Sequence, residues 1–249
     1  MTIHIFGDSY AHHPSLHPLN YFEDSYKRWM NMFSDEEEVI NYSKPSASLY
    51  YCFKKINDIR EQIDRDDKII FLLSDSKRLD FPFLKESDHS SSVYEIYQGR
   101  TNNENETYLE NWIHEIKLVF DMFEKEILNF YFYVISGLNY ISKKIGCRIL
   151  CLTCTDFLNN NSDFDLFFYN DKNFKVKNTN LFKISLEEFV DSKFNQKVES
   201  ERLNHLSREN HVVLYHIISN FFYETKFSEK FHTNLYDVEG TKIDRFIYA

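Results

Sequence analysis

The sequence predicts an α/β fold, a three-layer α/β/α sandwich around a mainly parallel five-stranded sheet. Short apolar runs alternate with longer amphipathic stretches along the 249 residues, an order typical of parallel strands joined by crossover helices. The run Ile-Ile-Phe-Leu-Leu at residues 69–73 is continuous and bounded by polar residues, as in a strand buried on both faces. With 43% hydrophobic residues and no internal repeat, the chain can bury one substantial core.

The elements follow from the spacing of the apolar residues. Strands are predicted over residues 3–6, 39–42, 69–73, 148–153 and 181–184. Helices are predicted over residues 48–63, over 108–144 with a break near Gly137, and over 206–223. Apolar residues recur every three or four positions in the first of these helices. Ser207 is a good N-cap for the last one, and Glu209 lies favourably in its first turn.

We predict one domain over residues 1–224, because no Pro-, Gly- or Ser-rich linker divides the chain. The polar stretch 75–106 is an insertion between the third strand and the long helix, and a loop of that length usually serves a function or moves. Residues 225–249 form a C-terminal tail rich in Phe and Tyr. We expect this tail to pack on the domain or to lie in an assembly contact.

Charge and composition exclude several classes of partner. The 29 basic and 39 acidic residues give a formal net charge of −10, which argues against nucleic acid or an anionic membrane as the main partner. The N-terminus has neither a basic region nor a long apolar segment, so no signal peptide is expected. The longest apolar stretch, residues 127–141, is shorter than the ~20 residues that span a bilayer. A cytoplasmic protein is the expectation.

Cysteine and histidine clusters give little sign of a metal site. Cys151 and Cys154 have CxxC spacing, but they lie in an apolar strand with no second pair downstream, which favours buried, reduced thiols. Near the N-terminus a cluster of three histidines is interrupted by prolines that prevent a helix from aligning it: His12, His13 and His17. No Walker A, GxGxxG, GxSxG or HExxH motif occurs. We predict neither a metal nor another cofactor.

The most informative segment is Gly7-Asp8-Ser9, directly after the first predicted strand. In parallel α/β folds the ligand binds at the carboxyl ends of the strands, so the residues directly after each strand are the ones to inspect. The segment resembles the first block of the SGNH (GDSL-type) hydrolase superfamily. This resemblance implies a flavodoxin-like SGNH fold in which Ser9 attacks an ester carbonyl and its backbone N–H helps to hold the oxyanion. Asp8 is assigned a supporting role in the turn.

A second segment, residues 41–48, follows the second predicted strand and is similar to the N-x-G-x-x-G-like loop of the same superfamily. The resemblance implies that Asn41 organises the loop and that the backbone N–H of Ser46 is another oxyanion donor. Both glycine positions are serines here, Ser43 and Ser46. A side chain therefore crowds the loop where the superfamily has none.

A third segment, residues 204–211, looks like the last block of the superfamily. The resemblance implies that His205 is the general base, which takes the proton of Ser9 and later returns it to the leaving group. His211 matches a position that the superfamily often fills with a structural histidine.

Two departures from the superfamily pattern affect the predicted site. The Asp that usually stands three residues before the base is Arg202 here, so the orienting partner of the base is left open among Glu201, Glu199 and a backbone carbonyl. The third block, which normally supplies an oxyanion-hole Asn, has Asp75 instead. A carboxylate would repel a developing oxyanion, and Arg78 is the candidate cation nearby.

These residues predict a serine-dependent ester hydrolase acting on small acyl esters or O-acetylated carbohydrate. The resemblance covers about the first 80 residues and the entry to the last helix near His205. Two alternatives stay open. In the first, the fold serves as a catalytically weak or inactive binding or assembly module, whose tail docks a partner or a second copy of the chain. An O-acyltransferase would use the same serine and differ only in the alcohol that resolves the acyl-enzyme.

Overall fold

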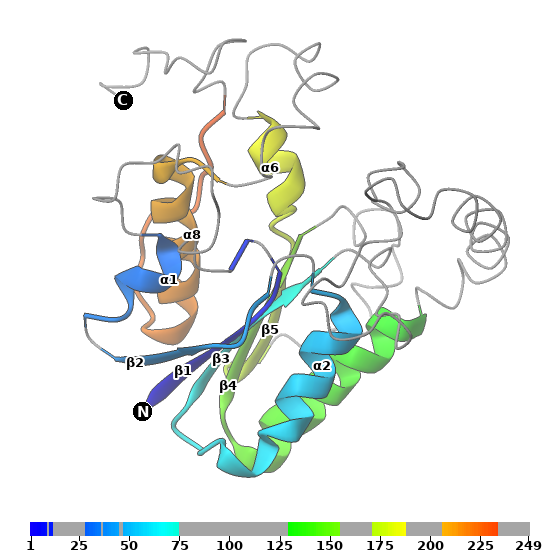
Figure 1. Cartoon of the computed structure of the whole chain (residues 1–249). Helices are drawn as coiled ribbons and strands as arrows, with labels where there is room; N and C mark the ends of the chain where they lie inside the picture. Colours follow the sequence, from blue (N-terminus) through cyan, green and yellow to red (C-terminus); the bar gives the residue numbers. More distant parts are fainter. Residues whose placement is uncertain are drawn as a thin grey trace, which may run out of the picture.

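The computed structural model describes residues 1–8, 10–11, 28–35, 37–44, 47–74, 129–154, 171–187 and 206–233. These ranges form an α/β protein around a five-stranded sheet with the order β2-β1-β3-β4-β5 (Figure 1). The strands are β1 (Thr2–Phe6), β2 (Glu38–Asn41), β3 (Lys68–Leu73), β4 (Arg148–Thr153) and β5 (Phe174–Lys177). All neighbouring strands pair in parallel. The predicted α/β class with a parallel five-stranded sheet is therefore confirmed.

Four of the five strands lie where the sequence predicts them, and the fifth does not. The segment predicted as a strand, residues 181–184, begins the helix α6 (Leu181–Glu187), whereas the fifth strand is β5. Leu181 and Ser185 are both buried, a spacing of four that suits a helix. A short apolar run does not by itself distinguish strand from helix. In β5 only Phe174 is fully buried, so its apolar signal is weak.

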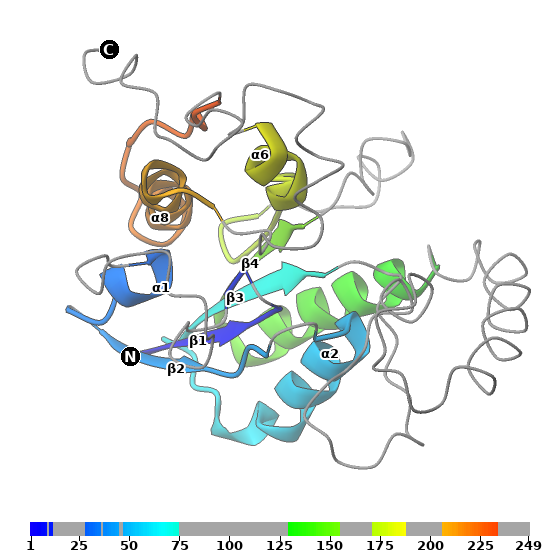
Figure 2. The same cartoon turned by 45° about the horizontal axis from the view of Figure 1, so that its top comes forward.

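Helices cover both faces of the sheet (Figure 2). On one face lie α2 (Leu49–Asp58), the short 3-10 helix η2 (Arg60–Gln62) and a helix over residues 129–145. The other face carries α1 (Trp29–Met32), α6 and α8 (Arg208–Phe222). Side chains of β3 alternate between these two cores: Ile69, Phe71 and Leu73 face α2, and Ile70 and Leu72 face α8. This alternation explains why the run of residues 69–73 is apolar without a break.

The helix α8 runs antiparallel to the strands. Its predicted N-cap is confirmed, since the hydroxyl oxygen of Ser207 accepts a hydrogen bond from the backbone N–H of Asn210 at 3.2 Å. At its other end, the carbonyls of Phe221 and Phe222 accept hydrogen bonds from the guanidinium of Arg148, the first residue of β4. The end of α8 thus lies at the amino edge of the sheet, and its beginning lies at the carboxyl edge.

The beginning of the predicted tail lies along α8. The side chain of Asn210 bonds both backbone groups of His232, at 2.9 and 2.7 Å. Farther along the helix, Asn220 accepts a hydrogen bond from the backbone N–H of Phe227 at 2.9 Å. The rest of the tail, residues 234–249, is outside the described ranges, as is the predicted insertion at 75–106.

A buried carboxyl group, Asp67, joins the amino ends of β1 and β3. It accepts hydrogen bonds from the backbone N–H groups of Thr2 at 2.8 Å and Asp64 at 2.9 Å, and its other contact is His4 Nε2 at 3.2 Å. Burial alone would raise the pKa of Asp67, but these hydrogen bonds and the nearby His4 together hold this pKa below its usual value. Beside it, Lys68 and Glu37 form a buried ion pair between β3 and the residue before β2.

Searching the described residues, we find no helix that combines the length and the apolarity needed to cross a membrane.

The helix over residues 129–145 is continuous through Gly137, so the predicted break there is wrong. The glycine serves another purpose. A Cβ atom at this position would lie 2.6 Å from Cζ of Phe53 on α2, closer than two carbon atoms can approach. The absence of a side chain therefore lets the two helices approach each other. Residues 108–128 of the predicted helix lie outside the described ranges.

We expect Gly137→Ala to lower the free energy of unfolding by up to about 2 kcal/mol, because overpacking a core typically costs about 1–3 kcal/mol and the higher helix propensity of Ala returns about 1 kcal/mol of it. In a Phe53→Ala background the same change should raise it by about 0.8–1 kcal/mol, the gain in helix propensity of Ala over Gly. Urea unfolding of the four proteins measures both effects. An equal change in the two backgrounds would show that the close approach plays no part.

Candidate functional site

The carboxyl edge of the sheet has a switch point between β1 and β3. From β1 the chain continues to β2 on one side, and from β3 it continues to β4 on the other. In open parallel sheets this is the place where the loops diverge and a ligand can bind. The described residues that follow the strands here are Gly7 and Asp8 after β1, Tyr42 and Ser43 after β2, and Ser74 after β3. The described residues of the predicted site therefore lie at the switch point.

Asp8 is the buried polar centre of this edge, with 1% of its surface exposed. Its Oδ2 accepts a hydrogen bond from the hydroxyl of Ser74 at 2.8 Å, and its Oδ1 accepts one from the backbone N–H of Tyr10 at 3.0 Å. Its own carbonyl accepts from the N–H of Ala11 at 3.0 Å. Asp8 therefore joins the ends of β1 and β3 and closes the turn of residues 8–11. Ser9 itself lies outside the described residues.

Ser74 connects three parts of the fold, although nothing in the sequence singled it out. Its hydroxyl lies within hydrogen-bond distance of both Asp8 and the carbonyl of Ala47, at 2.8 and 3.0 Å. Its carbonyl accepts a hydrogen bond from the hydroxyl of Tyr131 in the helix over 129–145. Because a hydroxyl has one proton to donate, these framework partners occupy Ser74 as a donor. The only sequence signal was a small polar residue directly after a buried strand.

Gly7 allows the end of β1 to lie close to β3. A Cβ atom here would lie 2.9 Å from three side-chain atoms of Leu72. The carbonyl of Gly7 also accepts a hydrogen bond from the N–H of Lys44, in the loop after β2, at 3.2 Å. The glycine of the Gly-Asp-Ser segment thus has a packing reason to be present.

Asn41 joins the two loops at this edge. Its Nδ2 donates to the carbonyl of Ala11 at 2.7 Å, and its Oδ1 accepts from the backbone N–H of Ser43 at 2.9 Å. The amide therefore holds the turn after β1 against the loop after β2. Ser46 and Arg78, the other predicted support residues, lie outside the described ranges.

The beginning of α8 reaches the same edge. Leu206, the residue before the N-cap, is buried in the same apolar cluster as Tyr10 and Ala11 of the turn after β1. His211, in the next turn of α8, is buried as well. The predicted base His205 and the residues near it, Arg202, Glu201 and Glu199, lie outside the described part of the chain. The immediate neighbours of Ser9 and of His205 thus lie at the same edge of the sheet and in the same apolar layer.

A third polar group at the carboxyl edge was not predicted. The hydroxyl oxygen of Thr153, at the end of β4, accepts hydrogen bonds from the N–H groups of Thr179 at 3.0 Å and Asn180 at 3.1 Å. The same hydroxyl donates to Oδ1 of Asn178 at 2.9 Å. This turn connects β5 to α6 and lies over the end of β4.

The four cysteines are free and buried. Cys151 faces the core beside α2, whereas Cys154 faces the core beside α8, so the two residues of the CxxC spacing lie on opposite faces of the sheet. Burial raises the pKa of Cys147 to about 11 and raises that of Cys151 further. These thiols are structural parts of the core.

Among the residues that are described, no group of three or more His, Cys, Asp or Glu side chains is placed to hold a metal ion. The histidines at positions 12, 13 and 17 are outside those ranges.

Comparison with models of known protein families finds no family that matches the chain, and comparison with curated proteins finds no significant relative.

We expect Asp8→Ala to lower the free energy of unfolding by about 1–3 kcal/mol, because the N–H of Tyr10 loses its acceptor in a buried site and the hydroxyl of Ser74 keeps only the carbonyl of Ala47. Asp8→Asn keeps one acceptor oxygen and should cost about half as much. The exposed Asp66 provides the control, since Asp66→Ala should change stability by less than about 0.5 kcal/mol. Urea unfolding measures all three. A loss below 1 kcal/mol for Asp8→Ala would contradict the role of Asp8 as the link between β1 and β3.

Proposed function

We propose that the protein is a serine-dependent ester hydrolase with the flavodoxin-like fold of the SGNH superfamily. One observation carries the proposal: Asp8 and Tyr10, which flank Ser9, and Leu206, which follows His205, belong to the same carboxyl edge of the sheet. The proposed nucleophile and base are about 200 positions apart in the sequence, yet the residues next to each of them lie at the same edge of the sheet. The strand order 2-1-3-4-5, with its switch point beside β1, supports the same assignment.

In the proposed reaction the hydroxyl oxygen of Ser9 attacks the ester carbonyl carbon, and its proton passes to His205. The tetrahedral intermediate collapses as the bond between the carbonyl carbon and the alkoxy oxygen breaks. His205 returns the proton to the departing alcohol, which leaves an acyl-Ser9 ester. Water, deprotonated by His205, then attacks this ester and releases the acid and the free serine. Glu201 is the proposed partner that orients the imidazole.

The oxyanion is proposed to bind the backbone N–H groups of Ser9 and Ser46, with Arg78 as a nearby cation. The described framework explains how such a hole can be held in place. Asp8 fixes the turn after β1 and Asn41 joins this turn to the loop after β2. Both donors therefore belong to segments that are tied to each other by side-chain hydrogen bonds.

The proposed substrates are small acyl esters or O-acetylated carbohydrate, and the reaction needs no cofactor. The acyl-enzyme can equally be resolved by an alcohol, which would make the protein an O-acyltransferase. Adding an alcohol acceptor to the assay separates the two reactions, because only a transferase diverts most of the acyl group to the alcohol.

We expect the protein to hydrolyse p-nitrophenyl acetate and to react with a fluorophosphonate probe. Ser9→Ala should abolish labelling and lower kcat by about 10³-fold or more, because a covalent nucleophile is lost, and His205→Ala should lower kcat similarly. The matched control is Ser136→Ala, which removes an exposed serine hydroxyl from the helix over 129–145 and should change neither readout.

Mass spectrometry locates the probe, which should be found on the tryptic peptide of residues 1–27. Labelling that persists in Ser9→Ala would overturn the assignment of the nucleophile. A wild-type protein that neither labels nor turns over ester would overturn the esterase itself and favour a binding or assembly module.

A further inference from the structure

The side chain of Asn180, at the carboxyl edge, has a buried N–H group that bonds no described residue. Asn180 is 8% exposed, and its Nδ2 has no hydrogen-bond partner among the residues that the structure describes. Its Oδ1 accepts a hydrogen bond from the backbone N–H of Lys183 at 3.1 Å, which caps the first turn of α6. This bond fixes which end of the amide is the oxygen, because only the oxygen can accept. The unused group is therefore an N–H donor.

The backbone holds this amide in a conformation that most residues avoid. Asn180 has a φ of +41°, in the left-handed region where Asn is one of the few residues with a side chain that is found regularly. Its N–H is bonded to the hydroxyl oxygen of Thr153 at 3.1 Å. A strained residue that is held firmly and leaves a buried donor unused is a pattern typical of functional sites.

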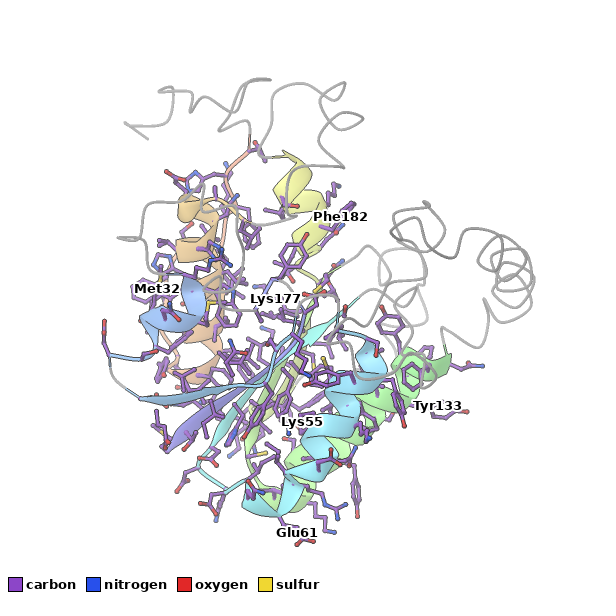
Figure 3. All side chains as sticks on the ribbon, in the orientation of Figure 1. Met32, Lys55, Glu61, Tyr133, Lys177 and Phe182 are labelled. Atoms are coloured by element: carbon purple, nitrogen blue, oxygen red, sulfur yellow. The ribbon has the colours of Figure 1, made fainter. Side chains whose placement is uncertain are left out.

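Residues of α6, which follows Asn180, link this helix to the turn that follows β1. The next residue, Leu181, belongs to the same apolar cluster as Tyr10, Ala11 and Leu206. The hydroxyl of Tyr10 lies 3.3 Å from that of Ser185, one turn into α6. Phe182, whose N–H donates to the carbonyl of Cys154 at 2.9 Å, marks the start of α6 beyond the strand ends (Figure 3).

Asn180 also lies within reach of the proposed site. Its anchor Thr153 ends β4, which is two strands from β1 in the sheet. With a strand spacing of about 4.8 Å, the ends of β1 and β4 are about 10 Å apart. The side chain of Tyr10 already crosses this gap to reach Ser185. For the amide to reach the carbonyl oxygen of an ester bound to Ser9, the side chains of Ser9 and Asn180 must together span this distance.

We propose that the side-chain amide of Asn180 is an oxyanion donor of the esterase, which binds the carbonyl oxygen of the substrate as it becomes negatively charged. The inference rests on the proposed function and deepens it. The third strand offers no asparagine for this task, since Ser74 and Asp75 follow it and the hydroxyl of Ser74 is occupied by Asp8 and Ala47. The donor comes instead from the turn between β5 and α6, where a buried amide N–H has no partner in the described part of the chain.

The test uses Asn180→Asp, which keeps the capping oxygen and the tolerance for positive φ, replaces the N–H donor with an oxygen and adds one negative charge. Loss of one donor from an oxyanion hole lowers kcat about 10²–10³-fold, so we expect that loss with p-nitrophenyl acetate, with KM changed less than about threefold. Asn180→Gly, which suits positive φ and adds no charge, should lower kcat to a similar extent.

The control is Asn178→Asp, which adds the same charge two residues away and keeps its acceptor for Thr153. Its kcat should stay within about threefold of the wild-type value.

Thermal unfolding of each variant accompanies the kinetics. Asn180→Asp keeps the cap but buries a carboxylate oxygen without a donor, so it should unfold at a lower temperature than the wild type, and the kinetics are measured at a temperature at which every variant is folded. Full activity of Asn180→Asp, or an equal loss in Asn178→Asp, would overturn the inference and leave Asn180 as a helix cap only. These outcomes require an active wild type that labels at Ser9. An inactive wild type would instead overturn the proposed function and this inference with it.

Discussion

The hydrogen bonds of the Asp8 carboxyl group are the interaction on which the carboxyl edge depends. One oxygen accepts from Ser74 after β3, and the other accepts from the backbone of Tyr10 beyond β1. Because Ser74 also contacts Ala47 and Tyr131, the same network reaches the segment that leads into α2 and the helix over residues 129–145. A buried carboxyl group is stable only when such partners surround it. The turn after β1 is therefore fixed from inside the protein.

Local signals in the sequence predicted much of the fold, and long-range contacts account for what they missed. The apolar run at 69–73 and the capping Ser207 were right, because burial on both faces and helix capping each leave a mark within a few residues. Gly137 was misread as a helix break because its reason is the ring of Phe53 on another helix. The segment 181–184 was taken for a strand, since four residues cannot show whether their period is two or 3.6.

The same distinction between local signals and long-range contacts applies to the residues of the candidate site. Asn41 was singled out by its position after the second strand, and the structure gives it bonds to both neighbouring loops. Ser74 and Asn180 could not be found in this way. The role of Ser74 comes from Asp8, which lies 66 residues away in the sequence. The role of Asn180 comes from its bond to Lys183, three residues away, and from its positive φ. In the proposed enzyme, the oxyanion hole is therefore assembled from different strand ends than the superfamily pattern implies.

The proposed chemistry requires that residue 9 and residue 205 lie side by side, and a chemical cross-link tests this most directly. In a Ser9→Cys, His205→Cys double variant a short bifunctional thiol reagent has two new targets, while the four native cysteines are buried. Our account predicts an intramolecular link between the tryptic peptides of residues 1–27 and 203–208. If both new thiols react with a monofunctional reagent and no link forms between them, the two groups are apart and the esterase mechanism is wrong.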